Sequence, residues 1–126
     1  MTCRTGRLPA PGLAGAAAGL ALAATLSLAL PVAADDAALA EGRAIAEDRN
    51  RGNCFSCHMA EGAEMAGNYG PPLMMMQQRY PDRQVLKQQI ADPRVRNPNT
   101  VMPPYGAHGI LTDRELELVV DYVHSL

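Results

Sequence analysis

Cys54-Phe55-Ser56-Cys57-His58 is the stretch that decides how this chain folds. Two cysteines that are separated by two residues and followed directly by a histidine are typical of a covalent c-type haem attachment site. Each thiol can form a thioether with one haem vinyl group, and His58 can then bind the iron from the proximal side. The motif therefore predicts one covalent haem, attached to Cys54 and Cys57 and ligated by His58.

Other sites also use a C-x-x-C pair. A thioredoxin-like redox pair follows a strand in a βαβ pattern, and the sequence shows no such pattern. A zinc site needs two further ligands at compatible spacing. The chain offers only His108 and His124, which are far from any paired spacing. A structural disulfide and a zinc site stay open as less favoured alternatives.

The N-terminal segment has the pattern of a signal peptide. Arg4 and Arg7 form a short positive region, and an uncharged apolar stretch follows them. The run Val32-Ala33-Ala34 then supplies small residues at the positions that signal peptidase requires. We therefore expect residues 1–34 to be a cleaved signal peptide and the mature protein to be periplasmic.

An uncleaved membrane anchor is the alternative, because the uncharged run from Leu8 to Ala34 is long enough to span a bilayer. Its first half is rich in Gly, Ala and Pro, so we expect cleavage and no stable membrane anchor. Cys3 leaves with this segment, and residues 35–126 then have only the two cysteines of the haem motif. Small secreted domains often depend on disulfides, so here we expect the haem to supply much of the core.

The charge balance disfavours one class of partner. The sequence has 11 Lys and Arg against 13 Asp and Glu, a net charge of −2. Arg4 and Arg7 lie in the predicted signal peptide, so the mature chain is more acidic, and it has no basic stripe. We therefore expect no nucleic-acid partner, whereas a protein partner with a complementary surface stays open.

Three helices are expected. The first runs from about Ala37 to Asn50, with Asp36 as its N-cap. The second begins behind Asp82 as N-cap and ends before Pro93, because the residue that precedes a proline avoids the α region.

The third helix is the clearest. Thr112 and Glu115 form a capping box, and apolar residues follow at helical spacing. These are Leu116, Val119, Val120 and Val123. Residues 62–72 and 96–106 are rich in Gly, Pro and Asn and are expected to be loops. No strand pattern is present, so the predicted class is all-α.

A methionine is the expected sixth ligand of the iron. Met59 is too close to His58 to reach the opposite face of the haem. The run Met74-Met75-Met76 is typical of a flexible apolar wall. Met102 stands just before the last helix, where Pro103-Pro104 stiffens the backbone and lowers the cost of holding a thioether on iron. We predict His58 and Met102 as axial ligands; the alternative is that Met102 anchors its loop in the core and leaves the iron open.

The proximal histidine also needs an acceptor for its other ring N–H group. Gly70-Pro71-Pro72-Leu73 is a loop stiffened by two prolines, and a backbone carbonyl there is a suitable acceptor. Pro71 is the predicted one. The alternative is that this segment is simply a turn.

In this order, C-x-x-C-H, Gly-Pro-Pro-Leu, a short helix and Met-Pro-Pro before a final helix resemble the class I cytochromes c. Three stretches more narrowly resemble SoxX, the monohaem cytochrome subunit of the sulfur-oxidising SoxAX complex. They are Gly52-Asn53-Cys54, Gly70-Pro71-Pro72-Leu73 and Asn97-Pro98-Asn99-Thr100-Val101-Met102-Pro103-Pro104-Tyr105-Gly106. The resemblance covers nearly all of residues 35–126 and identifies them as one small cytochrome c domain around one haem c.

The resemblance implies an electron-transfer subunit. In this family the SoxAX complex, an L-cysteine S-thiosulfotransferase, joins thiosulfate oxidatively to a cysteine of the SoxYZ carrier and releases two electrons. The reaction occurs at a haem of the SoxA subunit, and SoxX passes the electrons to a small soluble cytochrome c. This chain would form a heterodimer with a SoxA-like subunit. It offers no candidate acid, base or nucleophile, so no catalytic residue is predicted.

Two other functions fit parts of the pattern. A free periplasmic monohaem cytochrome c that carries electrons would share every haem feature. A ligand-binding or peroxidase-type haem protein needs an open iron position, and Met102 argues against that.

Overall fold

The computed structural model describes residues 32–126. Three longer helices are α1 (Val32–Glu47), α3 (Arg83–Ala91) and α4 (Asp113–Ser125). The shorter elements are the helix α2 (Met76–Arg79) and the 3-10 turns η1 (Cys54–Ser56) and η2 (Pro93–Val95). Within this part the chain has no strand, only an isolated bridge between Ala60 and Leu73. The all-α prediction is confirmed, whereas the predicted signal peptide falls outside the described residues except where α1 begins.

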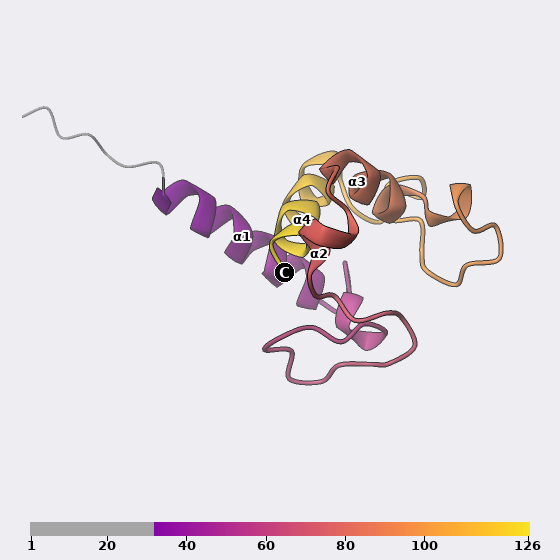
Figure 1. Ribbon diagram of the computed structural model, residues 1–126, viewed down its shortest axis with the longest axis horizontal. Helices are drawn as coiled ribbons and strands as arrows, with labels where there is room; N and C mark the ends of the chain where they lie inside the picture. The colour runs from indigo at the N-terminus through magenta and orange to yellow at the C-terminus, as the bar shows by residue number, and fades with distance from the viewer. Residues whose placement is uncertain (1–31) are drawn as a thin grey trace, which may run out of the picture.

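Helices α1 and α4 cross at close range and form the centre of the fold (Figure 1). Gly42 makes this approach possible, because a Cβ atom at its position would lie 2.1 Å from the carbonyl oxygen of Leu118 on α4. Ile45 and Ala46, one turn further along α1, are completely buried. An ion pair of 2.6 Å between Arg114 and Glu41 also joins the two helices.

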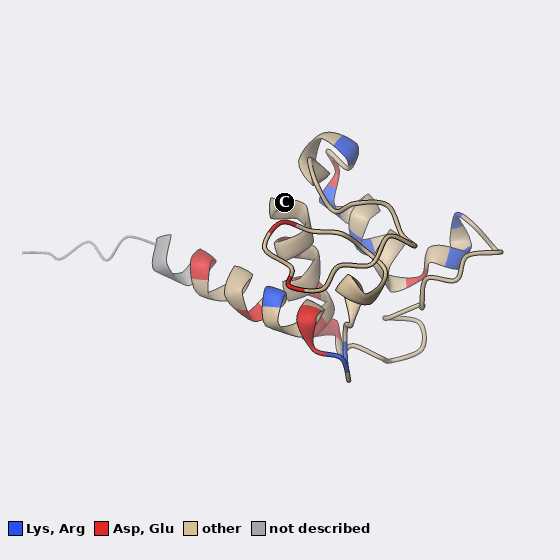
Figure 2. Ribbon diagram, turned by 90° about the horizontal axis from the view of Figure 1, so that it is seen from below, with Lys and Arg blue, Asp and Glu red and all other residues tan. Residues whose placement is uncertain are grey.

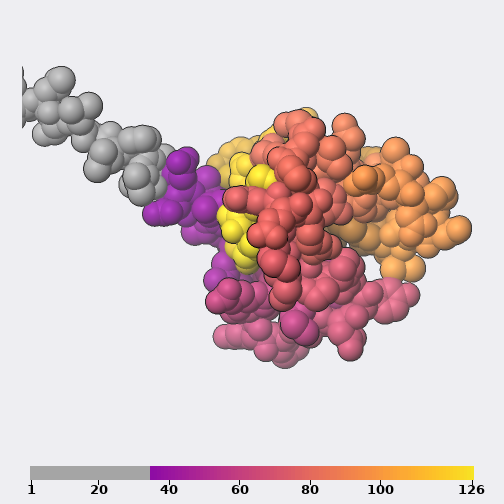
Figure 3. All heavy atoms as spheres, in the orientation of Figure 1, coloured from indigo at the N-terminus to yellow at the C-terminus, as the bar shows by residue number. Residues whose placement is uncertain are grey.

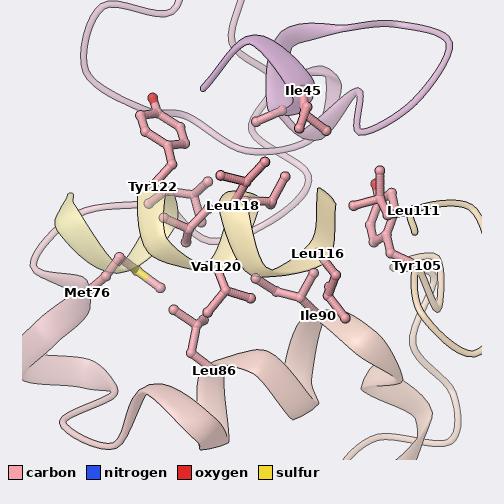
Figure 4. Packing of buried hydrophobic residues seen from close by; sticks show 14 of the residues in the cluster. Ile45, Met76, Leu86, Ile90, Tyr105, Leu111, Leu116, Leu118, Val120 and Tyr122 are labelled. Atoms are coloured by element: carbon pink, nitrogen blue, oxygen red, sulfur yellow. The ribbon is translucent and has the colours of Figure 1, made fainter. Parts of the chain in front are cut away.

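Helix α3 packs against another side of α4. Leu86 and Ile90 of α3 are buried near Val120 and Leu116 of α4 (Figure 4). Arg83 extends from α3 to Asp121, with 2.5 Å between Nε and Oδ1. Helix α4 thus has apolar neighbours on two sides, which explains why so much of its surface is apolar.

The N-caps of the last two helices are those that the sequence predicts. The Asp82 carboxylate accepts a hydrogen bond of 2.8 Å from the amide of Gln84, and α3 ends just before Pro93. At α4, Glu115 N donates to Thr112 Oγ1, and the Glu115 carboxylate accepts from Thr112 N at 2.9 Å. The predicted capping box is therefore present.

The bounds of the first helix were predicted wrongly. The helix begins at Val32, so Asp36 lies inside it rather than at its N-cap. It ends at Glu47 instead of about Asn50, because Asp48 folds the next residues into a turn. The Asp48 carboxylate accepts from Asn50 N at 2.8 Å, and its carbonyl accepts from Asn53 N at 2.9 Å. Such local bonds from aspartate compete with helix continuation.

Carboxylates are spaced along α1 and recur on the turn after it (Figure 2).

No helix among the described residues is long and apolar enough to cross a membrane.

Candidate functional site

A cavity of about 530 Å³ brings the predicted site residues together. Its wall includes Cys54, Cys57, His58, Pro71 and Met102. The remaining wall is polar along residues 49–53 and at Arg79 and Thr100. Helices α3 and α4 and the loop of residues 70–73 (the 70s loop) supply its apolar part. Leu73, Leu86, Ile90, Val119 and Val123 belong to it. In the space-filling view a notch separates the magenta segment near residue 60 from the orange segment near residue 100 (Figure 3).

The C-x-x-C-H motif forms the single turn η1 and the residues directly after it. Asn53 enters this turn in the left-handed conformation, with φ of 47°. The amide of His58 donates to the carbonyl of Cys54 at 3.0 Å, which closes the turn and presents both cysteines and the histidine to the cavity. Burial raises the pKa of the Cys54 thiol to about 11. Before any reaction this thiol is therefore protonated at neutral pH.

The His58 ring is held by the 70s loop. Its Nδ1 atom lies 2.7 Å from the carbonyl oxygen of Pro71, so Nδ1 carries the proton and donates it. The loop lies flat against the ring at Gly70, where a Cβ atom would be 2.4 Å from His58 Cε1. Only glycine leaves room for the imidazole here, and Nε2 remains available as a ligand.

Two backbone hydrogen bonds fix this loop to the haem motif. The amide of Gly70 donates to the carbonyl of Cys57, and the amide of Leu73 donates to the carbonyl of Met59, both at 2.7 Å. A third bond comes from a side chain that the sequence analysis did not single out. Arg79 Nη1 donates to the carbonyl oxygen of Pro72 at 2.6 Å.

Met102 lies half-buried on a loop that is shaped by its own polar residues. Thr100 N donates to Asn97 O at 3.0 Å, and Met102 N donates to Thr100 Oγ1 at 3.2 Å. Further along, Tyr105 is buried and its hydroxyl donates to Gly52 O at 2.7 Å. Burial strongly raises the pKa of Tyr105, so its hydroxyl stays protonated and can donate at all physiological pH values.

The methionines differ sharply in position. Met59, Met65, Met74 and Met75 are exposed and are not part of the cavity wall. Met76 does line the cavity, but it is buried in the core, and its sulfur lies 3.3 Å from Arg79 Nη1. Met102 is the methionine of the described residues that lines the cavity without a hydrogen-bond partner at its sulfur.

The donor set and the cavity fit a haem. Two thiols, an imidazole nitrogen and a thioether sulfur are the groups that attach and ligate a c-type haem. A volume of about 530 Å³ falls in the range of roughly 300–1,000 Å³ typical of cofactor sites. The described residues contain no group of three or more His, Cys, Asp or Glu that could hold a metal ion, so the zinc alternative finds no ligand set there.

A second hollow is larger, at about 800 Å³, and more open. It lies between α1 and the 62–67 loop, and its wall includes Arg43, Glu47 and Met65. None of the predicted attachment or ligand residues lines it, so volume alone does not identify the site.

Two comparisons with known proteins bear on the family of this chain. A family model described as cytochrome c matches residues 39–126. A protein of Aquifex aeolicus (strain VF5), described as an uncharacterized lipoprotein, is 33% identical over 76 residues. That alignment covers 60% of this chain and 37% of the relative, so the chain spans little more than a third of the relative's length.

Proposed function

Because this chain belongs to the cytochrome c family, we propose that it is the haem c electron-transfer subunit of a SoxAX complex. The family itself implies a covalently bound haem c, electron transfer by that haem and the small all-α class I cytochrome c fold. The proposal also names the residues that hold the haem, the reaction that supplies the electrons and the proteins that the chain binds.

Four residues hold the haem. Cys54 and Cys57 form the thioethers, and His58 and Met102 are the axial ligands. When bound, the haem supplies a one-electron redox centre. Pro71 keeps the His58 ring in one orientation and tautomer through the hydrogen bond to Nδ1. The observation that carries the assignment is that all five residues line one largely apolar cavity.

A thioether opposite an imidazole favours ferrous iron and raises the reduction potential. The apolar wall of α3 and α4 acts in the same direction, because a poorly solvated site disfavours the additional charge of ferric iron. The chain therefore provides an electron acceptor with a raised potential rather than a site where a substrate reacts.

The SoxX assignment is supported by the residues around Met102. The run from Asn97 to Pro104 is specific to that resemblance, and its Asn97 and Thr100 form the hydrogen bonds that shape the ligand loop. In the proposed complex a SoxA-like cytochrome binds this chain in the periplasm. Electrons released when thiosulfate is joined to the SoxYZ cysteine reach this haem and leave to a small cytochrome c. No residue of this chain is proposed to be catalytic.

A second function, that of a free periplasmic electron carrier, fits the same site. The family relationship and the site geometry apply equally to a cytochrome c that works alone. The two functions differ in whether the protein has a stable partner.

The experiment combines purification with reduction of the haem. The mature holoprotein is expected to co-purify with a SoxA-like subunit from its own cells. Alone it should accept electrons from a chemical reductant and remain oxidised with thiosulfate. Adding the SoxA-like subunit and SoxYZ should make its reduction depend on thiosulfate. A monomer at every salt concentration, with no thiosulfate-dependent reduction in the mixture, would contradict the SoxAX role and favour the free carrier.

A further inference from the structure

The segment that holds the His58 ring depends on few hydrogen bonds. Pro71 and Pro72 have no N–H groups, so their carbonyl oxygens are the only backbone groups they offer. Pro71 O accepts from His58, and Pro72 O accepts from Arg79 Nη1 at 2.6 Å. Among the described residues, Arg79 and His58 are the only side chains that donate to residues 70–73.

Arg79 is itself held in place from the end of the chain. It is the last residue of α2, and the first residue of that helix, Met76, donates its amide to Leu126 O at 2.7 Å. His124 Nε2 donates to Tyr80 O at 3.0 Å, directly after α2. A continuous set of contacts thus leads from the end of α4 through Arg79 to the loop around His58.

We propose that Arg79 is a positioning residue for the axial histidine. Its charged guanidinium holds the Pro72 carbonyl in a strong hydrogen bond, and this fixes the adjoining peptide so that Pro71 O faces His58 Nδ1. The bond to Nδ1 orients the ring and raises the basicity of the ligand nitrogen. The proposal rests on the assignment of His58 as an iron ligand, because only then does the orientation of the ring tune the haem.

The test measures the His58 hydrogen bond directly. The reduction potential is a less direct measure, because loss of the Arg79 charge and a weaker bond to His58 act in opposite directions. Solvent exchange of the His58 Nδ1 proton, followed by NMR in the ferrous holoprotein, reports the bond alone. We expect Arg79→Met to speed this exchange about tenfold, as loss of one hydrogen bond would, and to move the proton resonance upfield.

Three comparisons make the result specific. Gln78→Met places the same side chain on the same short helix, where no side-chain hydrogen bond is lost, and should leave the exchange unchanged. Arg79→Lys keeps a charged donor of similar reach and should restore most of the protection. Amide exchange at Val120 in α4 should not change in any variant, which distinguishes a local effect from general loosening.

An unchanged exchange rate in Arg79→Met, or an equal increase in Gln78→Met, would overturn the proposal. If Arg79→Met fails to load haem, Arg79→Gln gives the same test, because its amide ends two bonds short of the guanidinium nitrogens. The role of His58 as a ligand is judged separately, in the unchanged protein. If the ring protons of His58 lack the large upfield shift that the haem ring current causes, His58 does not bind the iron. That result would leave the exchange test of Arg79 intact.

Discussion

Tyr105 donates its hydroxyl proton to the carbonyl oxygen of Gly52, 2.7 Å away and 53 positions earlier in the chain. This bond joins the loop that carries Met102 to the turn that leads into Cys54. Both residues are buried, so neither group has water as a substitute partner. The bond therefore connects the segment of the proposed haem attachment to the segment of the proposed sixth ligand.

Replacing Tyr105 with Phe removes the donor and leaves the Gly52 carbonyl buried without a partner. The expected loss in free energy of unfolding is about 1–3 kcal/mol. Denaturant titration of the holoprotein measures it. Tyr69→Phe is the control, because the exposed Tyr69 makes no hydrogen bond through its hydroxyl among the described contacts, and it should be neutral. Equal stability of the two variants would show that the bond contributes nothing.

Replacing Gly70 with Ala should displace the His58 ring. The new Cβ would lie 2.4 Å from His58 Cε1, which is far inside van der Waals contact. We expect weaker iron ligation, seen as a rise in the high-spin fraction of the ferric optical spectrum.

Gly42→Ala provides the matched comparison. A Cβ there clashes equally badly, at 2.1 Å from Leu118 O, but at the crossing of α1 and α4. It should lower the unfolding temperature without changing the spin state of the folded protein. A wild-type spectrum in Gly70→Ala would contradict the close packing of the loop against the His58 ring.

Acid should destabilise the protein partly through Glu115. Hydrogen bonds from Thr112 and Arg51 hold the pKa of this carboxylate below its ordinary value of 4.5. A lowered folded-state pKa stabilises the fold above the unfolded pKa, and this contribution disappears as the pH falls from about 4.5 through the folded value. The unfolding temperature of Glu115→Gln should therefore fall less steeply than that of the wild type in this window.

Glu61→Gln is the control for that experiment, because the exposed Glu61 makes no ion pair among the described residues. It should keep the wild-type slope. If Glu115→Gln also keeps it, the capping box and the Arg51 pair do not contribute to acid sensitivity.

Attachment through Cys54 and Cys57 predicts that the denatured protein keeps its haem during acid–acetone extraction. With the predicted removal of residues 1–34, mass spectrometry should give the polypeptide from Asp35 to Leu126 plus one haem. Cys57→Ala leaves a single thioether and should show a shifted ferrous α-band, since one vinyl group then stays intact. A haem-free mass from cells with working cytochrome c maturation would contradict covalent attachment.

Local sequence signals predicted the caps of α3 and α4 well, because Asp82 and Thr112 bond to amides only two or three residues ahead. The end of α1 was missed, since the sequence alone does not show that Asp48 would bond forward into a turn rather than continue the helix. The short helix α2 was missed as well. It follows Met75 in a left-handed conformation, with φ of 50°, which a methionine does not signal.

Part of the candidate site could be located from the sequence for a different reason. Cys54, Cys57 and His58 are adjacent in the chain, and the two prolines mark the loop that contacts His58. Arg79 and Tyr105 act through contacts with backbone carbonyls that are distant in sequence or outside any motif. A carbonyl acceptor exists at every residue, so no sequence pattern identifies which one a side chain will reach.

The most direct test of the central claim, that Met102 completes the coordination begun by His58, is the optical spectrum of the ferric holoprotein. The unchanged protein should show the weak charge-transfer band of iron bonded to a methionine sulfur in the red. Met102→Ala should abolish that band and lower the reduction potential, whereas Met75→Ala should leave both unchanged because Met75 does not line the cavity. Survival of the band in Met102→Ala, together with its loss on changing Met74, Met75 or Met76, would contradict the account.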